Sequence, residues 1–229
     1  MTLIDDYLSE QINYEKKYGC NTIVLMQVGH FYEAYGVSND EEKTNDANMT
    51  KLSDIMNIQM TRKNKNITGN NRHNPLMIGV NIYSIDKYIQ ILLNANYTIV
   101  LISQTSEAPY VKREVTNIYS PGTNIEYSIK GDTNNLVGIY IEEINNQKTN
   151  KNILFIGASS IDLSTGNNIV FETHSTIDDK NFALDELFRF IQIYDPKELL
   201  FINKDVSISN DKLSNYLELN NRIVHYKDA

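Results

Sequence analysis

The chain has 229 residues, 41% of them hydrophobic, and a formal net charge of −8. This length accommodates one large domain or two of about 100 residues each. The net charge argues against general, unspecific binding of nucleic acid. No apolar run approaches the ~20 residues of a membrane-spanning helix, and a single cysteine excludes an internal disulfide and a cysteine-based zinc site.

The first half predicts helices alternating with strands, which indicates an α/β fold with a mixed sheet. Apolar residues at a spacing of about 3.6 predict a helix over residues 3–18, and Gly19 would end it. Ser84 is expected to cap a helix whose apolar face begins at Ile85. A further helix is predicted over 38–50, and strands are predicted over 22–28, 31–36, 53–60, 76–82, 97–104 and 113–119.

The second half begins after a boundary at Pro121-Gly122. The segment 121–134 contains Gly, Asn, Asp, Ser and Thr and is predicted to be a linker. Three antiparallel strands are then followed by helix, strand, helix and strand, an order that resembles the ribonuclease H-like layout. The strands are predicted over 136–143, 153–163, 168–173, 198–203 and 222–226, and the helices over 180–193 and 210–219.

The stretch from Gly29 to Glu33 carries the most chemical information, because an aromatic and a carboxylate follow a glycine at the end of an apolar strand. Residues i and i+2 of an extended segment point to the same side. Phe31 and Glu33 would therefore emerge together, as a flat ring for stacking and an acceptor for a base edge, while Tyr32 would point into the fold. Aromatic residues in strands are more often core residues, so the spacing alone also allows a buried Phe31.

A local basic segment interrupts this acidic chain. No acidic residue occurs between Ile55 and Ile85, whereas residues 124–229 carry most of the negative charge. A basic loop of this kind is compatible with phosphate contacts at one place, and a solvated polar loop is the alternative. The candidate phosphate-binding residues are Arg62, Lys63, Lys65 and Arg72, with His73 beside them.

Four blocks of the chain, in the same order, resemble the mismatch-recognition domain of the MutS family. Phe31 and Glu33 match its Phe-x-Glu signature, in a Gly-x-Phe-Tyr-Glu context. Residues 74–80 resemble the family's Pro-x-x-Gly-hydrophobic segment, and residues 84–89 resemble the helix that follows it. The other two blocks are the strand at 95–104 and the Arg-x-Val…Pro-Gly-Thr ending at 113–123. The resemblance covers the first half of the chain closely and the second half more weakly.

The resemblance implies an architecture of two α/β domains. It predicts a mixed-sheet mismatch-recognition domain over residues 1–120, a linker over 121–134, and a connector domain with a ribonuclease H-like fold over 135–229. The chain would then be the N-terminal part of a MutS-like mismatch repair protein, whose further domains, an ATPase among them, lie elsewhere. We therefore expect no enzymatic activity, no catalytic residue and no metal ligand within these residues.

The resemblance also implies a mechanism. Phe31 would act as a wedge that inserts beside a mispaired or unpaired base, and Glu33 would hydrogen-bond that base. Inserting a ring costs a few kcal/mol per base step, so discrimination would come from the weaker stacking and easier bending of DNA at a mismatch. Phosphates disfavour the charged form of a nearby carboxylate, so Glu33 would favour its protonated form and would also penalise binding to an undistorted duplex.

The implied partners are double-stranded DNA with mismatches or small loops, a second copy in a full-length homodimer, and a MutL-like protein. ATP and Mg²⁺ are expected only for the full-length protein, because no Gly-x-x-x-x-Gly-Lys-Ser/Thr motif occurs here. The acidic N-terminus lacks the layout of a signal peptide. We therefore expect an intracellular protein that is neither secreted nor membrane-bound, with cytoplasm, nucleus, organelle and viral factory all left open.

Three residues beside the wedge depart from the family pattern. His30 stands where many members have Asp, and Gln27 and Val28 stand where Arg and Met are common. The histidine replaces an anion with a titratable group, and we interpret it as a surface residue. Gln27 and Val28 affect the backbone contact that the resemblance implies just before the turn, and they leave the wedge intact.

Two alternatives come from other functional classes. In the first, Asp162 at the end of a strand would be the first metal ligand of a ribonuclease H-like nuclease, which needs several acidic groups around Mg²⁺. Asp162 also fits an ordinary hairpin turn. In the second, Phe31 is a core residue and the chain is a protein-interaction module. The other acidic residues available to a nuclease are Glu172, Glu186 and Asp205.

Overall fold

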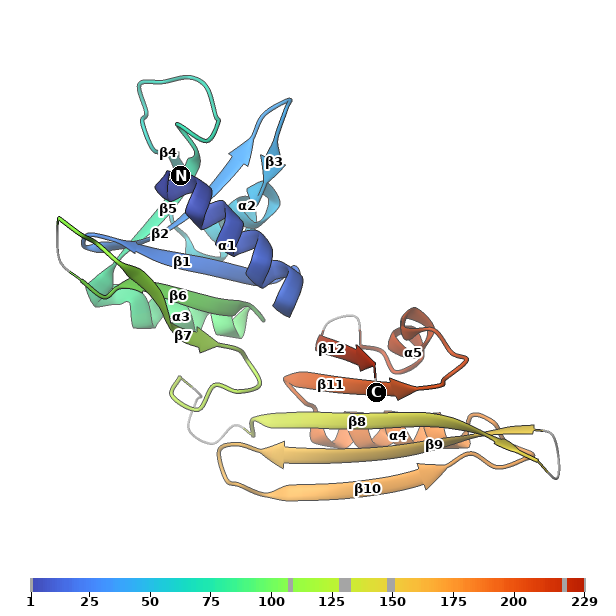
Figure 1. Ribbon diagram of the computed structural model, residues 1–229. Helices are drawn as coiled ribbons and strands as arrows, with labels where there is room; N and C mark the ends of the chain where they lie inside the picture. The colour runs from blue at the N-terminus through green and yellow to red at the C-terminus, as the bar shows by residue number, and fades with distance from the viewer. Residues whose placement is uncertain (1, 107–108, 128–132, 148–150, 220–221, 229) are drawn as a thin grey trace. The chain divides into compact units, whose positions relative to one another are not determined.

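The computed structural model describes residues 2–106, 109–127, 133–147, 151–219 and 222–228. The chain divides into two compact units, which meet in the sequence at Pro121 and Gly122 (Figure 1). Each unit has its own sheet and its own buried core.

The first unit is a mixed α/β structure, as the sequence predicts. Its sheet has the order β4-β5-β2-β1-β6-β7, with β3 paired to β2. Strands β1 and β6 are parallel, and the other pairs are antiparallel. The elements are α1 (Leu3–Tyr18), β1 (Thr22–Val28), β2 (Phe31–Ser38), β3 (Lys43–Thr44), α2 (Asp46–Met56), β4 (Thr61–Arg62), β5 (Leu76–Asn81), η1 (Ile82–Ser84), α3 (Ile85–Asn94), β6 (Thr98–Gln104) and β7 (Arg113–Tyr119).

Helix α1 is fixed at both ends and along one side. Thr2 and Asp5 form a capping box at its start, and Gly19 ends it with φ +99°. The Tyr7 hydroxyl donates to the carbonyl of Val24 in β1 at 3.0 Å. These contacts hold the helix against one face of the sheet (Figure 1), and the predicted helix over 3–18 is confirmed.

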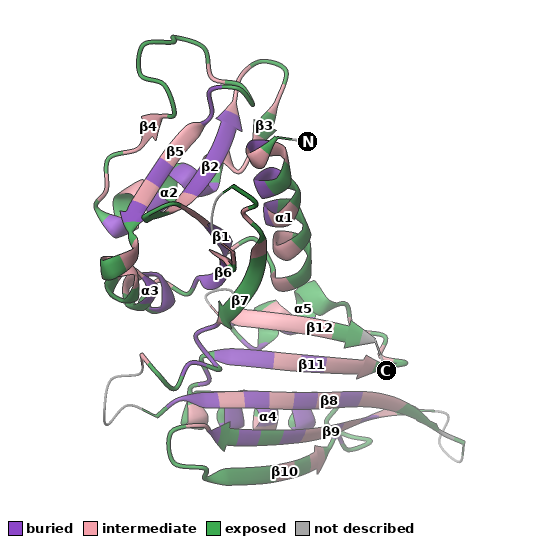
Figure 2. Ribbon diagram, turned by 60° about the vertical axis from the view of Figure 1, so that its left-hand side comes forward, coloured by how far each residue is buried: buried purple, intermediate pink, exposed green. Residues whose placement is uncertain are grey.

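Helix α2 packs on the opposite face. Successive residues of a strand point to opposite sides; in β2, Tyr35 points towards α1, and the next residue, Gly36, faces α2. A Cβ at Gly36 would come within 2.6 Å of Met49 Cγ, so the close approach of α2 to the sheet requires a glycine there. Figure 2 shows that the buried residues gather along the central strands between these layers.

The predictions for residues 38–60 were wrong. The helix predicted over 38–50 begins later, because β2 continues to Ser38 and α2 spans Asp46–Met56. The strand predicted over 53–60 is wrong, because its first residues belong to α2. Met49, Leu52 and Met56 are buried at helical spacing, which outweighs the short apolar–polar alternation after Ser53. Ser84 also differs from its prediction: its hydroxyl makes no cap hydrogen bond to α3 and donates to the carbonyl of Asn81 at 3.1 Å.

The second unit is a five-stranded sheet covered by helices on one face. The strand order is β10-β9-β8-β11-β12; β8, β9 and β10 are antiparallel, and β8, β11 and β12 are parallel. Val137, Leu187 and Phe201 are among the fully buried residues of its core. The elements are β8 (Asn135–Asn146), β9 (Lys151–Asp162), β10 (Asn168–His174), α4 (Phe182–Tyr194), β11 (Glu198–Lys204), α5 (Asn210–Tyr216) and β12 (Ile223–Asp228), in the order predicted from the sequence.

The first part of the predicted linker packs against the second unit. The Gly122 amide donates to Glu198 Oε2 at 3.2 Å, and the Asn134 amide group donates to the carbonyl of Asn124 at 2.9 Å. Residues 128–132 of this segment lie outside the described residues. Among the described residues, no helix has the length and apolar character that crossing a membrane requires.

Gly122 is expected to be sensitive to substitution. A Cβ at this position would lie 2.4 Å from Glu198 Cβ, so Gly122→Ala must displace the backbone or the glutamate. We expect the second unit to lose about 1–3 kcal/mol of stability, measured by urea unfolding followed by circular dichroism. Gly157→Ala in β9 is the matched control, because no atom lies within 4 Å of its added Cβ. Equal unfolding midpoints for the two variants would contradict this view of Gly122.

Candidate nucleic-acid interface

Strands β1 and β2 form a hairpin that ends in a two-residue turn. Val28 pairs with Phe31, and Gly29 and His30 lie between them. Gly29 has φ +60°, a conformation that glycine adopts readily and that two-residue hairpin turns require at their first position. The turn therefore makes Phe31 the first residue of β2.

Phe31 is exposed at this end of the sheet. The residue is 46% exposed, whereas Tyr35, four residues along the same strand, is fully buried. Asn81 of β5 pairs with Phe31 on the side away from Val28, so backbone pairing on both sides fixes the position of Phe31. The alternative in which Phe31 is a core residue is therefore wrong.

Glu33 lies on the same face of β2 as Phe31 and is half-buried. The Tyr35 hydroxyl donates a hydrogen bond to Glu33 Oε2. Burial raises the pKa of the Tyr35 hydroxyl well above its usual range, and the bond to Glu33 raises it further. Gly79 is opposite Glu33 in β5, and a Cβ at Gly79 would lie 3.5 Å from Glu33 Cγ.

Tyr32 points to the other face of the hairpin, as the alternation of a strand requires. Its hydroxyl shares a hydrogen bond of 2.7 Å with Ser103 of β6. Tyr32 therefore points to the face opposite Phe31, as expected. The residue is only half-buried, so part of its surface is accessible to solvent.

Polar side chains from three strands brace the turn. Gln27 Nε2 donates to the backbone carbonyl of Gly29 at 3.1 Å, and Gln27 Oε1 accepts from the backbone N–H of Gln104 at 2.9 Å. Arg113 Nε donates to the Gln27 carbonyl at 2.9 Å. Gln27 thus acts within the protein, to hold the hairpin. Arg113 also lines a hollow of about 680 Å³ beside α1. From the sequence, Arg113 was matched to a family block but was not predicted as a site residue, although it pairs with Gln104 at the ends of two predicted strands.

The four predicted phosphate-binding residues have different environments. Lys63 is exposed, and its ammonium lies 5.8 Å from the centre of the Tyr35 ring. Lys65 is exposed, and Arg62 donates to the Thr68 carbonyl at 2.6 Å.

Arg72, by contrast, is held within the fold. It forms ion pairs with Asp5 at 3.0 Å and with Glu42 at 2.8 Å. Hydrogen bonds from Thr2, together with the bond from Arg72, lower the pKa of Asp5 to about 2. Arg72 therefore ties the basic loop to α1 and to the β2–β3 connection, and it is less available to a phosphate than Lys63 or Lys65.

Asp162 serves a turn in the second unit. Its carboxylate accepts hydrogen bonds from the Ser164 hydroxyl at 2.7 Å, the Thr165 hydroxyl at 2.8 Å and the backbone N–H of Asn134 at 3.1 Å. These bonds hold the pKa of Asp162 well below its usual range. Across the described ranges, no three acidic, histidine or cysteine side chains gather in a way that could hold a metal ion. The hairpin-turn interpretation accounts for Asp162.

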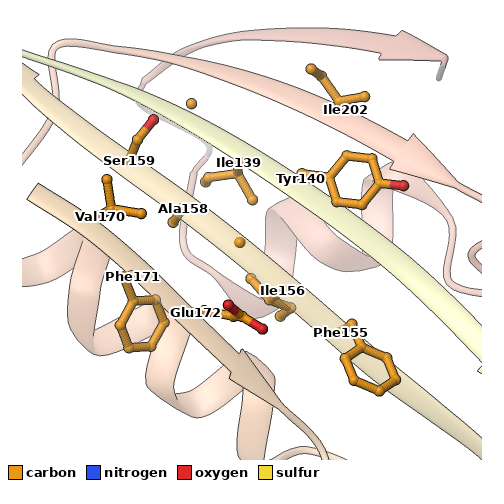
Figure 3. A pocket seen from close by; sticks show the side chains of 12 residues that line it. Ile139, Tyr140, Phe155, Ile156, Ala158, Ser159, Val170, Phe171, Glu172 and Ile202 are labelled. Atoms are coloured by element: carbon orange, nitrogen blue, oxygen red, sulfur yellow. The ribbon is translucent and has the colours of Figure 1, made fainter.

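The face of the second sheet that carries Tyr140 contains a hollow of about 510 Å³ (Figure 3). Gly138 and Gly157 line it, and a Cβ at Gly157 would meet no atom within 4 Å. Tyr140, Phe155 and Val170 also line it, and Val170 is 81% exposed. The hollow is therefore apolar and open to solvent.

Comparison with known proteins gives matches over both units. The family model described as MutS domain I matches residues 9–128. A mutS homolog of Acanthamoeba polyphaga mimivirus, named as a DNA mismatch repair protein, is 36% identical over 222 residues, which cover 95% of this chain and 19% of that protein.

Cellular relatives give weaker matches. The DNA mismatch repair protein MutS of Methanosarcina barkeri is 31% identical over 178 residues, 74% of this chain and 18% of that protein. MutS of Fervidobacterium nodosum is 27% identical over 214 residues, 90% of this chain and 22% of that protein. The chain thus spans about a fifth of the length of these relatives.

Proposed function

Because this chain belongs to the MutS family, we propose that its first unit recognises mismatched or unpaired DNA by inserting Phe31 beside the mispaired base. The observation that carries the proposal is the exposed ring of Phe31 beside a two-residue turn, with the Glu33 carboxylate on the same face of the strand. The test is a comparison of affinities, at fixed salt, for a matched duplex and for the same duplex with one unpaired base. We expect tighter binding to the second, and equal affinities would refute the proposal.

The energetics favour a sensor of DNA deformability. Opening a base step costs a few kcal/mol, and stacking a base on an aromatic ring returns about 1–3 kcal/mol. The two terms nearly cancel in a matched duplex. At a mismatch the stack is already weakened and the helix kinks more easily, so the same insertion becomes favourable without any sequence being read.

Glu33 makes a second contribution to the discrimination between mismatched and matched duplexes. Its carboxylate accepts a hydrogen bond from the displaced base, and in an undistorted duplex it faces phosphates without that compensation. The Glu33 carboxylate therefore weakens binding to the matched duplex more than binding to the mismatched one. Because specificity is the difference between those two binding free energies, Glu33 increases it.

Lys63 and Lys65 are expected to contact phosphates. Lys63→Ala and Lys65→Ala should each weaken binding to matched and mismatched duplexes by the same factor. Each should also reduce the slope of log affinity against log salt by about 1, because one fewer counterion is released. Titrations at several salt concentrations give both quantities, with Lys51→Ala, an exposed lysine of α2, as the control. A loss confined to the mismatched duplex would contradict the assignment.

We assign the second unit to the family's connector domain, with a ribonuclease H-like fold. The strand order β10-β9-β8-β11-β12, with antiparallel pairs followed by parallel ones, supports this assignment. In the full-length protein, this domain would relay the state of the DNA site to an ATPase outside these residues, which would use ATP and Mg²⁺ and act in a homodimer. The open hollow beside Gly157 is a surface available to a MutL-like partner.

A further inference from the structure

Glu33 is held by a neighbour on its own strand. Tyr35 lies two residues further along β2, on the same face, and its hydroxyl donates to Glu33 Oε2. Resting on the function proposed above, we propose that Tyr35 is a positioning residue, which fixes the Glu33 carboxylate so that it can accept a hydrogen bond from a base that presents an N–H donor.

The Tyr35 ring is a fixed point in the core. It is fully buried, and it meets the Tyr7 ring edge-on, with 5.1 Å between the ring centres and 82° between their planes. Tyr7 is itself anchored through its hydroxyl to the carbonyl of Val24. The backbone carbonyl of Tyr35 accepts from the Asn45 side chain at 2.8 Å. The ring therefore cannot move without disturbing the packing of α1 on the sheet.

The chemistry of the pair assigns the donor and the acceptor. Burial raises the pKa of the Tyr35 hydroxyl, so the phenol keeps its proton at neutral pH and donates the hydrogen bond, which Glu33 Oε2 accepts. A carboxylate has two acceptor oxygens, and Tyr35 engages one of them. Because Glu33 is only half-buried, the group retains acceptor capacity at the surface that carries Phe31.

The hydroxyl also limits the freedom of Glu33. A glutamate has several rotatable bonds and loses considerable rotamer entropy when it is fixed. In this chain the bond to Tyr35 fixes the side chain before DNA binds, so less entropy is lost when the base arrives. This preorganisation strengthens the contact without adding an interaction with DNA.

Tyr35→Phe tests the inference, because it removes the hydroxyl and keeps the ring. In the full-length protein we expect the ratio of mismatched to matched affinity to fall about 2- to 10-fold, which is the effect of one hydrogen bond. Tyr32→Phe is the matched control: it removes a hydroxyl that bonds Ser103 on the opposite face, and it should leave the ratio unchanged. An unchanged or increased ratio for Tyr35→Phe would overturn the inference.

A double-mutant cycle separates positioning from a general structural role. If Tyr35 acts through Glu33, then Tyr35→Phe should change nothing further in a Glu33→Ala background. A decrease of the same size in both backgrounds would overturn the inference. Should Tyr35→Phe fail to fold, Glu33→Asp, which is one methylene too short to keep this bond, should give the same loss; a wild-type ratio for Glu33→Asp would also overturn it.

The outcome for Tyr35 can be distinguished from the outcome for the proposed function. If wild-type protein and Phe31→Ala show the same mismatch preference, the proposed function fails and the Tyr35 inference fails with it. If Phe31→Ala loses the preference while Tyr35→Phe keeps it, the wedge stands and the positioning role of Tyr35 alone is refuted.

Discussion

Phe31→Ala should reduce the affinity for mismatched DNA by about 5- to 150-fold, since stacking one base on an aromatic side chain is worth about 1–3 kcal/mol. Affinity for the matched duplex should change little, because the wedge contributes little net free energy there. Stability should fall by about 1 kcal/mol at most, because Phe31 is 46% exposed and only part of its apolar surface is buried. Equilibrium titrations at fixed salt and urea unfolding measure the two effects.

The control for this substitution is Phe182→Ala. Phe182 begins α4 in the second unit and is 41% exposed, so the same atoms are removed from a similarly exposed residue that is not part of the hairpin. We expect its mismatch preference to equal that of the wild type. A loss of about 3–5 kcal/mol of stability in Phe31→Ala, typical of a core phenylalanine, would contradict the assignment of Phe31 to the surface.

Glu33→Ala should lower the ratio of mismatched to matched affinity roughly tenfold, through two effects whose free energies add. The affinity for matched DNA should rise about 2- to 5-fold, because one repulsion between the carboxylate and the phosphates is removed. The affinity for mismatched DNA should lose the hydrogen bond to the base, worth about 0.5–1.5 kcal/mol. Titration of both duplexes at two salt concentrations measures the effects separately.

Glu33→Gln separates charge from hydrogen bonding. It removes the charge and retains an acceptor of similar shape, so matched affinity should rise as in Glu33→Ala while the contact with the base is largely kept. Glu114→Ala, an exposed acid on β7, is the control for a general change in net charge. If Glu33→Ala weakens binding to the matched duplex, the repulsive role of Glu33 is wrong.

The hairpin could be predicted from the sequence because its signals are local. A strand that ends in glycine, followed by alternating side chains, places Phe31 and Glu33 on one face whatever surrounds them. The same alternation also places Tyr35 on that face, so its contact with Glu33 was within reach of the sequence. What the sequence could not show is that the Tyr35 ring is buried against α1, since that contact joins residues far apart in the chain.

Residues 38–60 were mispredicted because local and tertiary signals disagree there. Asn45, the residue before α2, has a left-handed conformation, which asparagine tolerates better than most residues, but its side chain makes no cap hydrogen bond that would mark the start of the helix. The alternation after Ser53 is too short to distinguish a strand from the end of a helix. Burial of Met49, Leu52 and Met56 against the sheet decides in favour of the helix.

The charge pattern predicted a basic loop but not the partners of its members. Arg72 was grouped with Lys63 and Lys65 because all three lie in an acid-free segment. Its partners, Asp5 and Glu42, are 67 and 30 residues away, and such pairings follow only from the tertiary fold. Phosphate contacts are therefore better assigned to exposed lysines than to every cation in the loop.

The most direct test of the wedge measures whether the base at the mismatch remains stacked. The fluorescence of 2-aminopurine placed at that position reports this stacking. At saturating protein, we predict that wild-type protein changes the fluorescence of the mismatched duplex and leaves that of the matched duplex unaltered. With the Phe31→Ala variant at saturating concentration, the fluorescence of both duplexes should equal that of free DNA. The same fluorescence change with wild-type protein and with Phe31→Ala would contradict the claim that Phe31 inserts beside the mispaired base.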